Sequence, residues 1–193
     1  MGRIGHCRQH ILDAGLAVLS QKGYNGTGVK EIVGAAGVPK GSFYNHFESK
    51  EAFVIEAMEK LADESSTRSE IILNDQTNSP KQRLLNLFDE NHQQLKSSEF
   101  CGGCLIGNLC LEMSDENPAI RDTANRIMDD YVNSIAECLT QAREAGELHT
   151  STNVKELAEF IHCAWEGTLM RMKASKACEP FNIFRSQLES FFL

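Results

Sequence analysis

The stretch Pro39-Lys-Gly-Ser-Phe-Tyr-Asn-His-Phe-Glu-Ser-Lys50 indicates a short helix with two different faces. Pro39 suits the first position of a helix, because its fixed φ is already helical there and its missing N–H leaves nothing unpaired. Phe43 and Phe47 are four residues apart, so their rings share one face, while the opposite face is small and polar. Its hydrogen-bond donors suit a duplex groove lined with phosphates.

The residues before this stretch supply partner helices. Apolar residues recur at helical spacing over 11–19 and again over 29–36, and Gly37 ends the second pattern. Thr27 is the predicted N-cap of the second helix, although Glu31 then stands one position late for a capping box. Helix, short helix, turn and short helix is the helix-turn-helix arrangement, which places a recognition helix in a major groove.

The two runs Gly23-Tyr-Asn-Gly-Thr-Gly-Val-Lys-Glu-Ile-Val33 and Ala35-Ala-Gly-Val-Pro-Lys-Gly-Ser-Phe-Tyr-Asn-His-Phe-Glu-Ser-Lys-Glu-Ala52 closely resemble the DNA-binding domain of TetR-family transcriptional regulators. The resemblance covers about the first quarter of the chain. It implies a helix-turn-helix DNA-binding domain over residues 1–48. Residues 49–193 would then form a larger helical domain for ligand binding and dimerisation.

The resemblance also implies roles in DNA binding for single residues. Thr27 corresponds to a helix cap that also touches a phosphate, and Lys50 corresponds to another phosphate contact. Tyr44 and His46 correspond to residues that grip the DNA backbone, and Asn45 to a variable position that reads a base edge. The alternative for Tyr44 and His46 is a polar cover over a small helical core, and for an isolated lysine it is simple solvation. The full predicted set is Thr27, Lys40, Gly41, Ser42, Tyr44, Asn45, His46 and Lys50.

Charge is distributed unevenly along the 193 residues. The chain has a net charge of −8, but residues 1–50 carry +3 and the remainder carries −11. A basic end on an acidic protein is compatible with DNA binding, because only one face has to meet phosphate. The larger acidic part is expected to stay away from the duplex.

The rest of the chain shows helical periodicity and no strand-like alternation of useful length, so we predict an all-α protein. A loop is expected over 74–80. Gly146 is a predicted helix stop, and the next helix is expected to be capped near Thr152. The apolar stripes of the expected helices lie over 53–62, 84–95, 120–139, 154–172 and 181–192.

The last two expected helices carry much aromatic surface that something must cover. The domain's own core is one candidate. The alternative, which the family resemblance implies, is a homodimer in which these helices meet their copies across a two-fold axis. A dimer also doubles the contact with DNA that one short recognition helix can make.

The seven cysteines are expected to be reduced thiols, because we find no secretory signal and no transmembrane run. This predicts a cytoplasmic protein without a membrane partner. An enzyme would need a nucleophile with a base, or a metal constellation. We find neither beyond a single Cys-x-x-Cys, so no enzyme activity and no cofactor is predicted.

The run Phe100-Cys-Gly-Gly-Cys-Leu-Ile-Gly-Asn-Leu-Cys110, which contains this Cys-x-x-Cys, allows three interpretations. A thiol redox pair of Cys101 and Cys104 would need an α/β setting, which is absent from the pattern. A metal-responsive site would need four ligands, with Cys110 and His92 completing the set. The third interpretation is a sensing thiol at Cys104, in the first turn of an apolar helix whose dipole favours thiolate.

Gly-Cys-Leu followed by a short helix, ahead of Glu-Met-Ser-Asp-Glu-Asn-Pro, is similar to the electrophile-sensing NemR-like subgroup of the TetR family. The resemblance implies that Cys104 is the sensing residue. Two alternatives stay open. Related regulators respond to noncovalent ligands, and a cysteine at this position can simply pack as a small apolar residue.

The family resemblance implies control by population shift. A ligand between the central helices would change the separation of the two recognition helices, and affinity for the operator would fall. Repression is the expected mode, with a small molecule or an electrophile as inducer. Ordinary core packing is the alternative for each predicted pocket residue, and these are Phe88, Cys104, Asn108, Met128, Tyr131 and Trp165.

Overall fold

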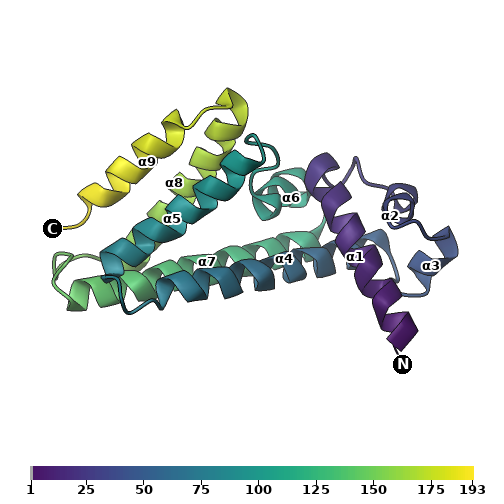
Figure 1. The fold of residues 1–193 in the computed structure, drawn as a ribbon, viewed down its shortest axis with the longest axis horizontal. Coiled ribbons are helices and arrows are strands. Elements are labelled where there is room, and N and C mark those ends of the chain that lie inside the picture. Colours follow the sequence, from purple (N-terminus) through teal and green to yellow (C-terminus); the bar gives the residue numbers. More distant parts are fainter. Residues whose placement is uncertain (1) are drawn as a thin grey trace. The chain divides into compact units, whose positions relative to one another are not determined.

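The computed structural model describes the backbone of residues 2–193 and the side chains from residue 7 onward. Over this part of the chain it contains nine α-helices and no β-strand, which confirms the all-α prediction (Figure 1). None of these helices is both long and apolar enough to cross a membrane. The helices are α1 (Gly2–Lys22), α2 (Val29–Ala35), α3 (Lys40–Tyr44), α4 (Lys50–Leu73), α5 (Pro80–Ser97), α6 (Leu105–Met113), α7 (Pro118–Glu144), α8 (Val154–Ser175) and α9 (Glu179–Ser190).

The helices form two compact units that interleave along the chain. Unit 1 comprises residues 2–62 and Leu105–Ile127, and unit 2 comprises Asp63–Cys104 and Met128–Leu193. Helices α4 and α7 therefore each contribute to both units. The predicted domain boundary between residues 48 and 49 stays a prediction.

Unit 1 packs around aromatic rings from α3, the turn that follows it and the start of α4. Phe43 is fully buried, and its ring centroid lies 5.2 Å from that of Phe47 and 5.7 Å from that of Phe53. Gly15 lets α1 come close to these rings. A Cβ at Gly15 would lie 2.3 Å from Cζ of Phe53 and 2.8 Å from Cγ2 of Ile32. The burial of Phe43 and Phe47 agrees with the face predicted from their spacing.

Two helix starts in unit 1 differ from the prediction by one residue. Gly28 is the N-cap of α2, because the hydroxyl of Thr27 instead donates to the carbonyl oxygen of Gly23 at 2.7 Å. Glu31 thereby becomes the third residue of α2, and its carboxylate accepts a hydrogen bond from the N–H of Gly28 at 3.1 Å. Pro39 is the N-cap of α3, with an extended ψ of 149°, and not its first helical residue.

Unit 2 is built around rings from α5, α8 and α9. The ring centroid of Phe88 lies 5.1 Å from that of Trp165 and 4.9 Å from that of Phe184. Helices α8 and α9 run antiparallel side by side (Figure 1). Gly146, with φ of 76°, turns the chain after α7 as predicted, while α8 is capped by Asn153, next to the predicted Thr152.

His92 of α5 is a buried histidine within the core of unit 2. Its ring stacks on Phe181 of α9 with centroids 3.9 Å apart, and its Nε2 has no hydrogen-bond partner among the described residues. Burial lowers the pKa of His92 below its usual value, nearby Lys96 lowers it further, and Asp89 opposes the shift. The folded protein therefore favours the neutral imidazole.

This burial predicts that stability falls in mild acid. Below pH ~6.5 the unfolded chain binds a proton at His92 that the folded chain does not accept, so stability is present above this pH and is lost as pH falls. The free energy of unfolding, measured in denaturant at pH 7.5 and 5.5, should drop by more in the wild type than in His92→Phe. A drop in His92→Phe equal to that of the wild type would contradict the prediction, and the exposed His149 offers a control.

Candidate DNA-binding surface and thiol site

The predicted recognition residues form an exposed polar surface on α3 and the turn after it. Lys40, Gly41, Tyr44 and Asn45 are exposed, and the buried ring of Phe43 fixes the orientation of this surface. Two further predicted residues, at positions 42 and 46, are half-buried. A Cβ at Gly41 would meet no atom within 4 Å, so open space lies in front of the backbone there. The surface can therefore approach a flat or grooved partner closely.

Two other predicted DNA contacts are engaged inside the protein. Thr27 is fully buried, and its hydroxyl is used by the bond to Gly23. Lys50 is half-buried, with its Nζ 3.0 Å from the carbonyl oxygen of Tyr24 and 3.7 Å from the centroid of the Tyr24 ring. Burial lowers the pKa of Lys50, although the charge of Glu112 opposes this shift. These residues hold the turn before α2 in place.

Glu112, near the end of α6, fastens the same turn. Its two carboxylate oxygens accept hydrogen bonds from the backbone N–H groups of Tyr24 and Asn25, each at 2.7 Å. We call this pair of bonds the Glu112 brace. All of these atoms belong to unit 1. The brace connects α6 directly to the segment that leads into the helix-turn-helix, and it was not predicted from the sequence.

The three cysteines near the start of α6 do not form one site. Cys101 is exposed, with its Sγ 3.6 Å from Nζ of Lys176, while Cys110 lies on α6 in unit 1. Cys104 directly precedes α6, one position earlier than the predicted first turn. Within the described residues, no group of three or more His, Cys, Asp or Glu side chains could hold a metal ion. The ligand set required by the zinc alternative is therefore not assembled.

Cys104 takes part in a polar cluster within unit 2. Its thiol donates a hydrogen bond to the carboxylate of Glu166 on α8, which also interacts with the charge of His162 one turn earlier. Tyr131 of α7 is hydrogen-bonded with Ser65 of α4, and its ring centroid lies 6.2 Å from that of His162. We call these five residues the thiol cluster. Three helices and the segment before α6 thus contribute to one polar cluster that contains a thiol.

Burial dominates the electrostatics of the thiol cluster. It raises the pKa of Glu166, while the hydrogen bond from Cys104 and the charge of His162 act in the opposite direction. Burial also raises the pKa of Tyr131, against the effect of the Ser65 hydrogen bond. The cluster therefore contains a carboxylate that is a stronger base than an exposed one, next to a thiol that can supply a proton.

The six predicted pocket residues separate into different environments. Two of them belong to the thiol cluster. Phe88 and Trp165 are buried in the ring core of unit 2, which is the packing alternative left open by the sequence. Met128 is half-buried in unit 2, and Asn108 lies on α6 in unit 1. A shared ligand pocket for all six stays a prediction.

Glu166 and His162 of the thiol cluster were not predicted from the sequence. A usable signal was present, because Glu166 is the sole acidic residue in the otherwise mostly apolar stretch 161–172. A carboxylate on the core face of a helix needs a partner. Nothing in the periodicity of α8 identifies Cys104 as that partner, since the two residues are far apart in the sequence.

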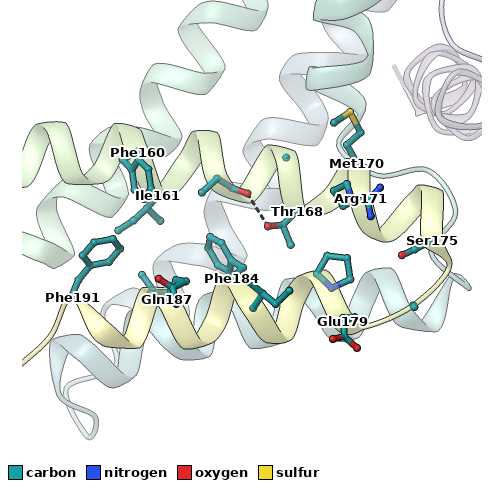
Figure 2. Close-up of a pocket in the computed structure, with 16 residues that line it drawn as sticks. Phe160, Ile161, Thr168, Met170, Arg171, Ser175, Glu179, Phe184, Gln187 and Phe191 are labelled. Atoms are coloured by element: carbon teal, nitrogen blue, oxygen red, sulfur yellow. Dashed lines mark hydrogen bonds between the residues drawn. The ribbon is translucent and has the colours of Figure 1, made fainter.

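An apolar groove lies between α8 and α9, with a volume of about 700 Å³ (Figure 2). Large apolar side chains are exposed along it, and two of them, Phe160 and Phe191, pack edge to face with centroids 5.9 Å apart. Phe160, Met170 and Ile183 are each more than half exposed. Such a concentration of exposed apolar surface is typical of a protein interface.

Comparison with known protein families shows which family has this architecture. Residues 11–57 match the family model described as "Bacterial regulatory proteins, tetR family". Residues 80–188, more than half of the chain, match the model "Tetracyclin repressor-like, C-terminal domain". The chain belongs to the TetR family. This confirms the family predicted from the helix-turn-helix stretch. TetR-family proteins are DNA-binding regulators that respond to small molecules and act as dimers.

TetR-family relatives match this chain over almost its whole length. The HTH-type transcriptional repressor DhaR of Mycobacterium sp. (strain GP1) is 35% identical, covering 92% of this chain and 87% of the relative. The HTH-type transcriptional repressor NemR of Escherichia coli (strain K12) is 30% identical, covering 90% of this chain and 87% of the relative. These relatives are transcriptional regulators rather than enzymes. At the level of the family, this agrees with the prediction that the chain has no enzyme activity.

Solved TetR-family structures share the fold. A regulatory protein TetR from Rhodobacter sphaeroides superposes with a TM-score of 0.91 at 30% identity, covering 96% of this chain and 98% of the other. The reduced form of E. coli NemR superposes with a TM-score of 0.90 at 26% identity, covering 97% of each chain. Both therefore contain counterparts of the helix-turn-helix and of the larger helical part.

Proposed function

We propose that this TetR-family protein is a repressor that leaves its operator when Cys104 is modified by an electrophile. The observation that carries the proposal is the position of α6. Cys104 immediately precedes this helix, and Glu112, eight residues further along the chain, fastens the turn before α2. The backbone of α6 thus joins Cys104 to Glu112, and the two hydrogen bonds of Glu112 join α6 to the turn before α2. A change at Cys104 can reach the helix-turn-helix along this path.

The proposed DNA contacts are the exposed recognition residues on and after α3. We assign direct contacts to Lys40, Gly41, Tyr44 and Asn45, and to the half-buried side chains at positions 42 and 46. Thr27 and Lys50 are proposed to act mainly by holding the turn before α2, because both are engaged with backbone carbonyls. Operator DNA implies that the protein acts in the cytoplasm.

Fluorescence anisotropy with duplexes tiled from the upstream region of the gene tests the proposal at fixed salt. We expect N-ethylmaleimide to release the specific duplex from the wild type and from Cys101→Ser, but not from Cys104→Ser. Cys101→Ser is the matched control, because Cys101 is the more exposed thiol of the pair. If N-ethylmaleimide releases the duplex from Cys104→Ser as well as from the wild type, Cys104 only packs as a small apolar residue, and a noncovalent inducer is favoured.

A charge substitution tests the proposed DNA surface. Lys40→Gln should weaken binding about equally for all duplexes and reduce the slope of log K against log salt by about 2, since each protomer of the DNA-bound dimer loses one phosphate contact. Lys155→Gln, which changes another exposed lysine at the start of α8, should leave both quantities unchanged. An unchanged slope for Lys40→Gln would place the contact elsewhere.

We also propose that the groove between α8 and α9 is the surface through which two copies form the homodimer. Ile183→Asp, on the exposed side of α9, should convert dimer to monomer in analytical ultracentrifugation, because a charge would be buried in the apolar interface. Ile71→Asp is the matched control, since Ile71 is another exposed isoleucine, on α4 outside the groove. A dimer in Ile183→Asp as tight as in Ile71→Asp would contradict the assignment.

A further inference from the structure

The thiol cluster has a built-in acceptor for the proton of Cys104. The thiol donates its hydrogen bond to the carboxylate of Glu166, and this carboxylate lies on α8, far from Cys104 in the sequence. A thiol is a weak nucleophile until it loses its proton, so a base in hydrogen-bond contact determines how fast it reacts. This inference rests on the proposed function, because the proton transfer serves regulation only if Cys104 is the sensing residue.

The groups around the carboxylate favour this role for Glu166. His162 lies one helical turn away and is buried, while Tyr131 faces the same sulfur and carboxylate from α7. Arg68 acts on Tyr131 from α4 and is itself exposed. Burial makes the carboxylate a stronger base than a solvated one, which brings its proton affinity closer to that of a thiol.

We propose that Glu166 is the general base for modification of Cys104, and that its negative charge selects uncharged electrophiles over anionic ones. The chemical class is neutral activated alkenes and neutral alkyl halides. Glu166 is the residue that sets both the rate of the reaction and the charge of the inducer.

The proton and electrons balance for both kinds of reagent. With an activated alkene, the sulfur forms an S–C bond as its proton passes to Glu166, and the π electrons of the alkene move to the neighbouring activated carbon. Glu166 then returns the proton to that carbon. With an alkyl halide, the S–C bond forms, the halide leaves with the bonding electrons, and the proton on Glu166 passes to solvent. Neither reaction needs an oxidant or a reductant.

The charge selection is a consequence of Coulomb's law. A carboxylate on the reagent would come within a few ångströms of the carboxylate of Glu166, in a site with little solvent to screen them. A neutral reagent of the same size meets no such repulsion. The two reagents should therefore differ in rate at Cys104 by roughly tenfold or more.

Iodoacetamide and iodoacetate form a matched pair of reagents, because they differ mainly in one charge. We would follow alkylation of Cys104 in the full-length protein by peptide mass spectrometry, with fragmentation that separates Cys104 from Cys101. In the wild type, iodoacetamide should react faster than iodoacetate by roughly tenfold or more. In Glu166→Gln, the rate with iodoacetamide should fall by roughly tenfold to a hundredfold, and the preference for the neutral reagent should shrink toward that of a free thiol.

Two further variants separate the proposal from a loss of structure. Glu166→Asp keeps the charge and should restore part of the preference for iodoacetamide. Glu159→Gln removes an exposed carboxylate on the same helix, which lies 3.8 Å from the sulfur of Cys163, and should leave the rates at Cys104 unchanged. An iodoacetamide rate that stays equal or rises in Glu166→Gln overturns the proposal, as does an unchanged preference between the two reagents.

Operator binding measured on the same alkylated samples distinguishes this inference from the proposed function. If alkylation of Cys104 depends on Glu166 but the modified protein still binds its operator, the sensing role fails and the proton transfer stands. If modified protein leaves the operator and Glu166→Gln is modified as fast as the wild type, the regulator stands and the general base is wrong.

Discussion

Phe43→Ala should lower the free energy of unfolding of unit 1 by about 3–5 kcal/mol and abolish operator binding. Phe43 is fully buried and touches the rings of Tyr44, Phe47 and Phe53, so removing its ring leaves a cavity at the centre of the cluster. The five-residue helix α3 has too few hydrogen bonds of its own to survive this loss. Denaturant unfolding and anisotropy with the operator duplex measure the two effects.

Tyr44→Ala is the control for Phe43→Ala, because it removes the neighbouring ring from the exposed side of α3. Tyr44 is 55% exposed, so its loss should change stability by less than about 1 kcal/mol while still weakening DNA binding. A stability loss in Phe43→Ala no greater than in Tyr44→Ala would show that α3 does not depend on its buried ring.

Glu112→Gln should destabilise unit 1 by about 2 kcal/mol, although it replaces a single oxygen atom of a half-buried side chain. The carboxylate accepts hydrogen bonds from two backbone N–H groups, and bonds to a charged acceptor contribute about 1.5–3 kcal/mol each. The amide of glutamine can accept with its oxygen only, so its NH₂ group would face one of the two N–H groups.

Hydrogen exchange provides a direct measurement of the Glu112 brace. The amide protons of Tyr24 and Asn25 should exchange faster in Glu112→Gln, and the free energy of unfolding should fall with them. Glu116→Gln is the control, since Glu116 is an exposed acid just beyond α6. If protection of both amides is unchanged in Glu112→Gln, the brace does not hold the turn.

The Glu112 brace also has a functional expectation under the proposed mechanism. A loosened brace should reduce the response to alkylation, because movement at the start of α6 would no longer reach the turn before α2. The ratio of operator affinities before and after alkylation should therefore fall in Glu112→Gln. This ratio is independent of how much affinity the unmodified variant has lost.

The features that could be predicted from the sequence are those governed by local spacing. The burial of Phe43 and Phe47 follows from their separation by one helical turn, and the stop at Gly146 follows from the ease with which glycine adopts the positive φ found there. The prediction of Thr27 as a cap was wrong because a threonine hydroxyl can bond either to the next helix or to the turn that precedes it. Only the folded backbone decides between the two.

The features that could not be predicted join residues far apart in the chain. Glu112 meets Tyr24 across 88 residues, and Glu166 meets Cys104 across the whole of α6 and α7 and the first half of α8. Helical periodicity identifies which face of a helix is buried but not which side chain lies opposite. The polar contacts between helices therefore could be identified only from the structure. This holds even for Cys104, which the sequence had already indicated as a candidate sensing residue.

The interleaving of the two units has a consequence for the synthesis of the protein. Unit 1 includes Leu105–Ile127, so it cannot be completed when the ribosome has made only the first 62 residues. The helix-turn-helix must wait for α6 to emerge before Glu112 can fasten its turn. Residues 63–104 of unit 2 are translated in the meantime. A nascent chain therefore gains its complete DNA-binding unit only after Cys104 has been added.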